Sequence, residues 1–173
     1  VPKDLFIYSA MDCYIHCVES LEGTYINELS RTYAESALKL CTEALNSDNP
    51  DLSKLLTASY LGGVSIVNSE VGICHALSYG LSLEYDYRHG LANCIIFNHL
   101  EEYYHSHVTV FKEILKKHNI NLPKNLSMNF RPDSIKNMIN IALKMERPLE
   151  NAFGENWKNL FSKKEIELIY KKL

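Results

Sequence analysis

The chain has 173 residues, enough for one compact domain with a sizeable core. Its 46% hydrophobic and 23% charged residues are the balance of a soluble globular domain, and its longest uncharged stretch, residues 55–69, is too short to cross a bilayer. Residues 1–111 carry 5 basic and 14 acidic side chains, whereas residues 112–173 carry 13 basic and 7 acidic ones. The lysines of the basic part are dispersed among Ile and Leu at helical spacing. They predict a solvated helix face, and nucleic-acid binding is not expected.

The first half of the chain predicts a series of α-helices. Residues 11–21 form the first, in which Asp12 and His16 stand four residues apart and therefore lie one turn apart on the same face. Residues 28–45 repeat apolar side chains at the i, i+3, i+4, i+7 spacing of a core-facing helix. Residues 52–69 have few charges and are predicted to form a buried helix.

Two further histidines stand fourteen residues apart, His75 in a predicted helix over residues 70–83 and His89 shortly after it. On one straight helix they would be about 21 Å apart, at about 1.5 Å per residue. The chain must therefore fold back between them if both bind the same ion. We expect the break at Gly80 or Gly90, because glycine interrupts helices most easily.

One carboxylate and three imidazoles form an oxygen and nitrogen ligand set that suits Fe²⁺ or Zn²⁺. The predicted ligands are Asp12, His16, His75 and His89. The five cysteines include no C-x-x-C pair and lie mostly in apolar runs, so we expect reduced, buried thiols in a cytoplasmic protein. A thiolate from Cys13 or Cys74 is an alternative ligand. The remaining histidines are expected to be structural or surface residues: His99, His105, His107 and His118.

The second half of the chain also predicts helices, over residues 91–104, 107–118 and 132–145, with a loop at residues 119–131. Ser162 and Glu165 have the spacing of a capping box before a terminal helix. No alternating strand and no Gly-rich phosphate-binding loop appears. The predicted fold class is therefore all-α, without a nucleotide site of the usual kind.

The motifs together resemble a known family. The runs MDCYIHCVES, NSEVGICHALSYG and YRHGLANCIIFNHLEEYY are similar to the metal-binding half of the iron-containing alcohol dehydrogenases, a dehydroquinate synthase-like group. The positions that match the family pattern after the Asp and His pair are Asn68, Gly72, His75, Ala76, His89 and Gly90. The runs MDCYIHCVESLEGTY and NCIIFNHLEEYY look most like one branch, the enzymes that oxidise the C8 hydroxyl of 3-deoxy-manno-octulosonate.

This resemblance implies reversible hydride transfer between an alcohol and a nicotinamide cofactor, with Asn68 as a substrate contact. Where the family commonly has a second histidine linked to proton movement, this chain has Tyr79. Tyr79 is thus the predicted catalytic residue, although an aromatic packed in the core is an equal alternative. Asn68 has its own alternative, an amide that satisfies a helix turn. Two other functions stay open: a metal-dependent lyase or hydrolase of the same fold group, and a non-catalytic helical metal-binding or dimerisation domain.

The resemblance also implies a domain organisation. Residues 1–173 are expected to be the helical C-terminal metal-binding domain of a two-domain enzyme, and the α/β nucleotide-binding domain is expected to precede it. NAD(P) would bind in that other domain, so the 173-residue chain is expected to be inactive alone. The expected partners are a small alcohol or sugar acid and the other domain, with no nucleic acid and no membrane. A homodimer is a further expectation.

Overall fold

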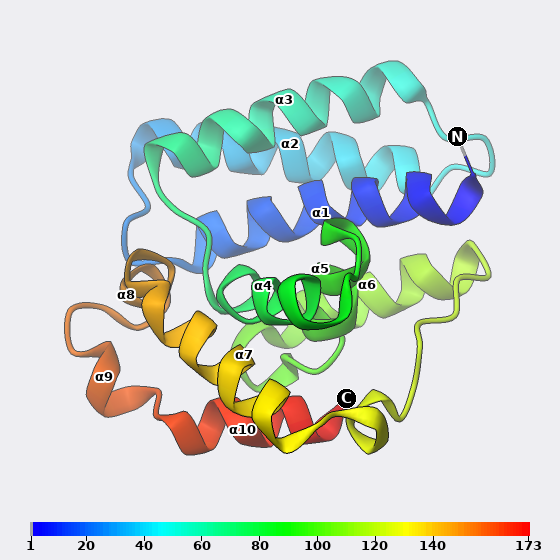
Figure 1. Ribbon diagram of the computed structural model, residues 1–173. Helices are drawn as coiled ribbons and strands as arrows, with labels where there is room; N and C mark the ends of the chain where they lie inside the picture. Colours follow the sequence, from blue (N-terminus) through cyan, green and yellow to red (C-terminus); the bar gives the residue numbers. More distant parts are fainter. Residues whose placement is uncertain (1) are drawn as a thin grey trace.

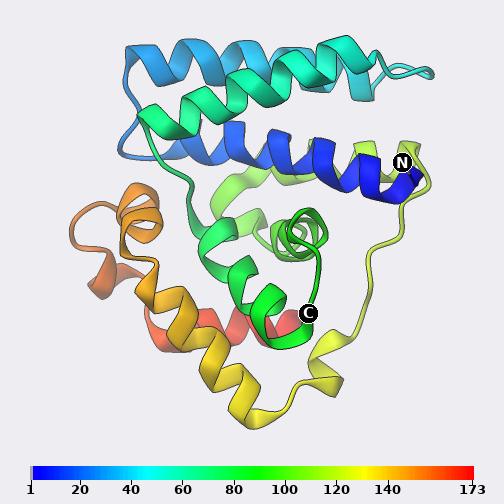
Figure 2. The same ribbon diagram turned by 45° about the horizontal axis from the view of Figure 1, so that its top comes forward.

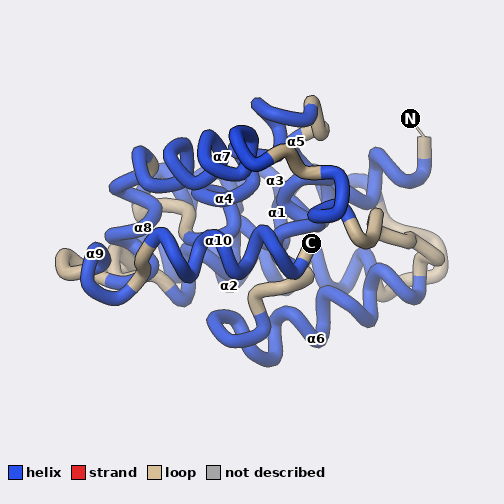
Figure 3. Tube along the Cα trace, turned by 60° about the horizontal axis from the view of Figure 1, so that its bottom comes forward, coloured by secondary structure: helices blue, strands red, loops and turns tan. Residues whose placement is uncertain are grey.

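The computed structural model describes residues 2–173, and within that part of the chain it contains helices and no strand, as Figure 3 shows. The predicted all-α fold is therefore confirmed. The helices are α1 (Lys3–Glu22), α2 (Glu28–Leu45), α3 (Leu52–Asn68), α4 (Ile73–Tyr85), α5 (His89–Phe97), α6 (Glu101–Lys117), the 3₁₀ helix η1 (Leu126–Asn129), α7 (Pro132–Lys144), α8 (Glu146–Phe153), α9 (Trp157–Leu160) and α10 (Lys163–Lys172). None of them combines the length and apolar character needed to cross a lipid bilayer.

Helix α1 is the central element. It packs against α2 and α3 on one side and against α4, α5 and α6 on the other, and Figures 1 and 2 show it lying between these two groups. From Ile7 to Ser20 most of its side chains are buried, because both of its faces are covered. Helices α7 and α10 complete the second group by packing on each other and, through α7, on α4. Residues on α1 can therefore meet residues of α4 and α5 in the interior.

The prediction that residues 52–69 are buried is wrong. Helix α3 lies on the outside, and only the face that carries Leu55 and Ala58 packs against α1 and α2. Its other face is also apolar but exposed: Leu56 is 74% and Val67 is 84% exposed. A low density of charge does not by itself indicate burial, because the exposed face of this helix is apolar as well.

The break between His75 and His89 exists, but neither glycine makes it. Helix α4 ends at Asp86, which adopts a left-handed conformation with φ of 57°, and α5 begins at His89. Gly80 lies inside α4, where a Cβ atom would stand 2.7 Å from the hydroxyl of Tyr170. Gly90 lies inside α5, where a Cβ atom would stand 2.8 Å from the Tyr8 carbonyl oxygen. Both glycines permit close helix packing rather than a change of chain direction.

Several helix boundaries differ from those predicted. The first helix begins eight residues earlier, at Lys3, and the predicted helix over residues 91–104 is interrupted after Phe97. The predicted gap before residue 107 coincides with His105, which has non-helical torsions of φ 31° and ψ −111° within α6. Helices α8 and α9 were not predicted. The capping box before α10 is confirmed, since Glu165 accepts the backbone N–H of Ser162 at 2.5 Å.

Candidate metal centre

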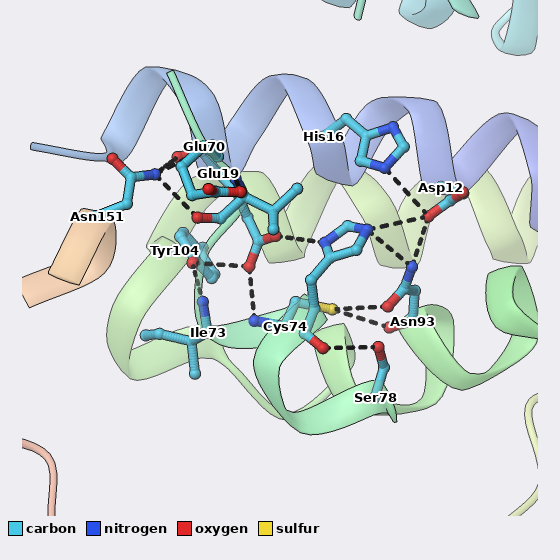
Figure 4. Close-up of polar contacts among 12 residues, drawn as sticks. Asp12, His16, Glu19, Glu70, Ile73, Cys74, Ser78, Asn93, Tyr104 and Asn151 are labelled. Carbon is cyan, nitrogen blue, oxygen red and sulfur yellow. Dashed lines mark hydrogen bonds and ion pairs between the residues drawn. The ribbon is translucent and has the colours of Figure 1, made fainter. Parts of the chain in front are cut away.

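The four predicted ligands come from three helices and meet in one cluster. Asp12 and His16 lie on α1, with 3.9 Å between Asp12 Oδ1 and His16 Nε2. His75 in the first turn of α4 and His89 at the start of α5 place their Nε2 atoms 3.4 and 3.5 Å from the same oxygen. One ligand atom from each residue lies within 4.8 Å of those of the other three. Figure 4 shows Asp12 and His16 on the face of α1 that this cluster occupies.

The cluster is buried at one end and open at the other. The side chain of His75 is only 2% exposed, those of Asp12 and His16 are 18% and 21% exposed, and that of His89 is 42% exposed. A small molecule therefore approaches most easily past His89.

The charges of the cluster favour an anionic Asp12 and shift the histidines in different directions. Burial raises the pKa of Asp12, but the hydrogen bond from His75 and the charges of the three histidines lower it to about 2. Burial lowers the pKa of His75, yet the charge of Glu19 and contacts with Asp12 raise it to about 9. Burial lowers the pKa of both His16 and His89. Two of the imidazoles are thus neutral at pH 7 and ready to bind a cation.

Glu19 is a buried partner of His75 that the sequence interpretation did not include. Its Oε2 lies 2.5 Å from His75 Nδ1, and its Oε1 accepts hydrogen bonds from the Cys74 backbone N–H at 2.6 Å and the Tyr104 hydroxyl at 3.1 Å. Figure 4 shows Glu19 reaching from α1 toward Cys74 and Tyr104. The cluster therefore continues inward as a hydrogen-bonded network.

Asn93 is a second partner that was not predicted. Its Nδ2 lies 2.5 Å from Asp12 Oδ1, 3.0 Å from His75 Nε2 and 3.1 Å from His89 Nε2. An amide NH₂ group carries two hydrogens, so Asn93 can donate to two of these three atoms at a time. Asn93 thus contacts three of the four predicted ligands, one on each of α1, α4 and α5.

A signal for both residues was present in the sequence. Glu19 follows Asp12 by seven residues and His16 by three, so all three share one helix face. Asn93 follows His89 by four residues, which places it one turn further along α5. Polar residues at these offsets from predicted ligands would have identified both.

Tyr79, the predicted catalytic residue, lies at the open end of the cluster. Its ring stacks on His89 with centroids 5.7 Å apart and an interplanar angle of 28°. Burial raises its pKa above 10, and the charges of Asp12 and Glu70 raise it further. Tyr79 also lines a cavity of about 590 Å³, together with Glu70, Val71, Arg147 and residues 143–146 and 148. Tyr79 therefore contacts His89 and also lines this cavity.

The structure does not bring Asn68 into the cluster. Asn68 is exposed at the end of α3, and its Nδ2 donates to the Val64 carbonyl at 2.8 Å. This contact agrees with the alternative interpretation, an amide that satisfies a helix turn. Neither Cys13 nor Cys74 belongs to the group of four ligands. The Cys74 thiol donates to the Asn93 carbonyl at 3.3 Å, and burial raises its pKa well above the usual range.

All five cysteines are buried and free of disulfides, as predicted. The other histidines have partners away from the cluster. His118 Nε2 lies 2.7 Å from the Leu45 carbonyl oxygen, and His107 Nε2 lies 3.2 Å from Glu22 Oε1. These contacts agree with structural and surface roles for both histidines.

The chain is similar in sequence to known alcohol dehydrogenases and to one family model. The family model described as "Fe-containing alcohol dehydrogenase family, C-terminal" matches residues 6–150. Over 110 residues the chain is 28% identical to the bifunctional aldehyde-alcohol dehydrogenase AdhE of Escherichia coli, covering 60% of this chain and 12% of that protein. It is 29% identical over 108 residues to the 1,3-propanediol dehydrogenase of Citrobacter freundii, covering 59% of this chain and 28% of that protein.

Solved structures share the fold over the whole chain. A 1,3-propanediol oxidoreductase superposes with a TM-score of 0.80 at 18% identity, covering 99% of this chain and 52% of that one. An iron-containing alcohol dehydrogenase from Thermotoga maritima gives a TM-score of 0.74 at 21% identity, covering 99% and 49%. The chain therefore spans about half the length of these structures and a smaller part of the curated relatives.

Proposed function

This chain belongs to the iron-containing alcohol dehydrogenase family, and we propose that it supplies the metal-binding half of an enzyme that transfers hydride between an alcohol and a nicotinamide cofactor. The convergence of one carboxylate and three imidazoles from three helices carries this proposal. The relatives above are named as alcohol dehydrogenases, which favours this function over a lyase, a hydrolase or a non-catalytic domain.

The cluster fits a divalent metal ion. A tetrahedral ion with bonds of about 2.1 Å separates its ligand atoms by about 3.4 Å. Asp12 Oδ1 lies at about this separation, 3.4, 3.5 and 3.9 Å, from the Nε2 atoms of His75, His89 and His16. The Asn93 amide, which lies among these atoms, would turn aside to admit the ion. The donor set, three nitrogens and one oxygen, suits Fe²⁺ or Zn²⁺. We propose that these four side chains hold one such ion.

The residues around the cluster have separate roles in the proposed reaction. A divalent ion in this position would act as a Lewis acid toward the substrate oxygen. Asp12 would balance part of its charge, and the Asn93 amide would give up its contacts with the imidazole nitrogens of His75 and His89 to the ion. Tyr79 retains its proton at neutral pH because its pKa is raised, so we propose that it donates a hydrogen bond to the substrate oxygen instead of acting as a base.

We propose that the rest of the substrate occupies the cavity beside Tyr79. The cavity holds about 590 Å³, enough for a small alcohol or a sugar acid. The similarity of MDCYIHCVESLEGTY and NCIIFNHLEEYY to one branch of the family supports a narrower proposal, oxidation at C8 of 3-deoxy-manno-octulosonate. Asn68 remains a predicted substrate contact, which would require its amide to leave the Val64 carbonyl.

We propose that NAD(P) binds to an α/β domain outside this chain. The matched structures are about twice as long as this chain, which leaves room for such a domain. Hydride transfer requires the nicotinamide within about 3–3.5 Å of the substrate carbon, so it needs both halves. The buried free cysteines support a reducing, cytoplasmic location.

The test is an assay of the full-length protein that contains this chain, loaded with Fe²⁺ or Zn²⁺. NAD(P)H formation would be followed by absorbance with ethanol, propane-1,3-diol and 3-deoxy-manno-octulosonate. We expect metal-dependent turnover with at least one alcohol, and with the octulosonate if the narrower proposal holds. Metal binding without oxidation of any alcohol in a broad panel would refute the proposed reaction. Failure to bind either metal would refute the proposed metal centre.

A further inference from the structure

Glu19 is a buried carboxylate that contacts the predicted ligand His75 but is not itself a predicted ligand. Its side chain is 0% exposed. Its Oε1 accepts hydrogen bonds from the Cys74 backbone N–H and the Tyr104 hydroxyl, and its Oε2 lies 2.5 Å from His75 Nδ1. Both oxygens of Glu19 can therefore accept hydrogen bonds from the groups that face them. Within residues 2–173, its ion-pair partner is His75.

The position of Glu19 is fixed by groups other than His75. The Cys74 N–H belongs to the first turn of α4, and the Tyr104 hydroxyl in turn accepts the Ile73 backbone N–H at 3.3 Å. The Tyr104 ring is stacked on Phe97, with centroids 5.4 Å apart. The carboxylate is therefore held independently, and the imidazole of His75 is oriented against it.

We propose that Glu19 is the positioning residue of His75, which rests on the metal centre proposed above. A neutral imidazole carries one N–H, and the hydrogen bond that this N–H makes determines which nitrogen keeps a free lone pair. With Nδ1–H donated to Glu19, the lone pair of Nε2 points to the cluster, where Nε2 lies 3.4 Å from Asp12 Oδ1. Glu19 thereby fixes both the tautomer and the ring plane that metal binding requires.

Glu19 also balances the charge of the centre. A buried charge is costly unless an opposite charge compensates it. Asp12 and Glu19 together carry two negative charges on the two nitrogen sides of His75, at 3.4 and 2.5 Å. Three neutral imidazoles contribute none, so one dication makes the five side chains neutral as a set. Glu19 therefore strengthens the binding of a divalent ion that it does not contact.

The experiment compares Glu19→Gln with Tyr104→Phe as a matched control. Glutamine keeps the size of the side chain but presents an NH₂ group to donors and removes the charge. Tyr104→Phe removes one hydrogen bond to the same carboxylate and keeps the His75 contact. Zn²⁺ affinity would be measured by competition with a chromophoric chelator, and ligand geometry by the visible absorption of Co²⁺. We expect Glu19→Gln to weaken Zn²⁺ binding about 10- to 100-fold and to alter the Co²⁺ spectrum. Tyr104→Phe should change the affinity much less.

A second measurement uses the unchanged protein and applies even if Glu19→Gln does not fold. In the Zn²⁺-loaded protein with ¹⁵N-labelled histidine, nitrogen NMR should show His75 protonated at Nδ1 and metal-bound at Nε2. Metal at Nδ1, or an unprotonated Nδ1, would overturn the proposal. So would a folded Glu19→Gln variant that binds Zn²⁺ as tightly as the wild type. A wild type that binds no metal would instead overturn the proposed function, and the role of Glu19 with it.

Discussion

Gly90 lies where α5 packs closely against the backbone of α1, and Gly90→Ala should separate the two helices. The new Cβ atom would lie 2.8 Å from the Tyr8 carbonyl oxygen and 3.0 Å from its carbonyl carbon. Both are backbone atoms, so a side-chain rotation cannot relieve the clash. Overpacking of this kind costs about 1–3 kcal/mol, whereas alanine gains about 1 kcal/mol over glycine within a helix. We therefore expect a net loss of up to about 2 kcal/mol in the free energy of unfolding.

Gly63→Ala is the matched control, because Gly63 lies in α3 with no atom within 4 Å of a Cβ atom. That variant should be about 1 kcal/mol more stable than the wild type. The difference between the two variants therefore isolates the clash, about 1–3 kcal/mol, and urea denaturation would measure it. Moving α5 should also shift His89 away from Asp12 and weaken Zn²⁺ binding in Gly90→Ala alone. A Gly90→Ala protein as stable and as metal-avid as Gly63→Ala would refute this reasoning.

Three further predictions concern the metal centre and the need for a cofactor site outside this chain. His89→Ala should lose most metal affinity and activity in the full-length enzyme, whereas His105→Ala should lose neither; equal metal loss by chelator titration would show that the ligand set is wrong. In the metal-free protein, burial lowers the pKa of His75, but Glu19 and Asp12 raise it to about 9, above the value of about 6.5 in the unfolded chain. Protonated His75 therefore stabilises the fold fully below about pH 6.5, and this stabilisation is lost as the pH rises through about 9. The urea-derived free energy of unfolding should thus fall by about 2 kcal/mol more between about pH 7 and pH 9 in the wild type than in His75→Gln, and an equal fall would contradict the shift. The 173-residue chain alone, loaded with metal, should show no NAD(P)H formation, and turnover near that of the full-length protein would mean that it holds its own cofactor site.

The parts of the site that depend on local geometry could be predicted from the sequence. Asp12 and His16 share a face of α1 because four residues make about one helical turn, whatever the rest of the chain does. The fold-back between His75 and His89 followed from distance alone. Its position did not, because Asp86 rather than a glycine takes the left-handed conformation. Such a residue is chosen by the packing of α4 and α5, which no spacing along the chain describes.

The roles of the glycines and of the exposed helix were beyond the sequence for the same reason. Gly80 and Gly90 are needed because Tyr170 and the backbone of Tyr8 come close to them, and both contacts join segments far apart in the chain. The exposure of α3 depends on which of its two apolar faces meets α1. Periodicity identifies a helix and its faces, but tertiary packing decides which face is covered.

The arrangement of acidic residues on α1 explains how the metal centre can be rigid and still accessible. Asp12 and Glu19 lie two turns apart on one helix and reach His75 from opposite sides of its ring, at Nε2 and at Nδ1. An imidazole held at both nitrogens from a single helix has its plane fixed relative to that helix. Helix α1 is in turn fixed by α2 and α3 on its other side. The buried end of the cluster is thus held by the central helix of the fold, and the proposed ligand that remains most exposed is His89, at the start of α5 and stacked on Tyr79.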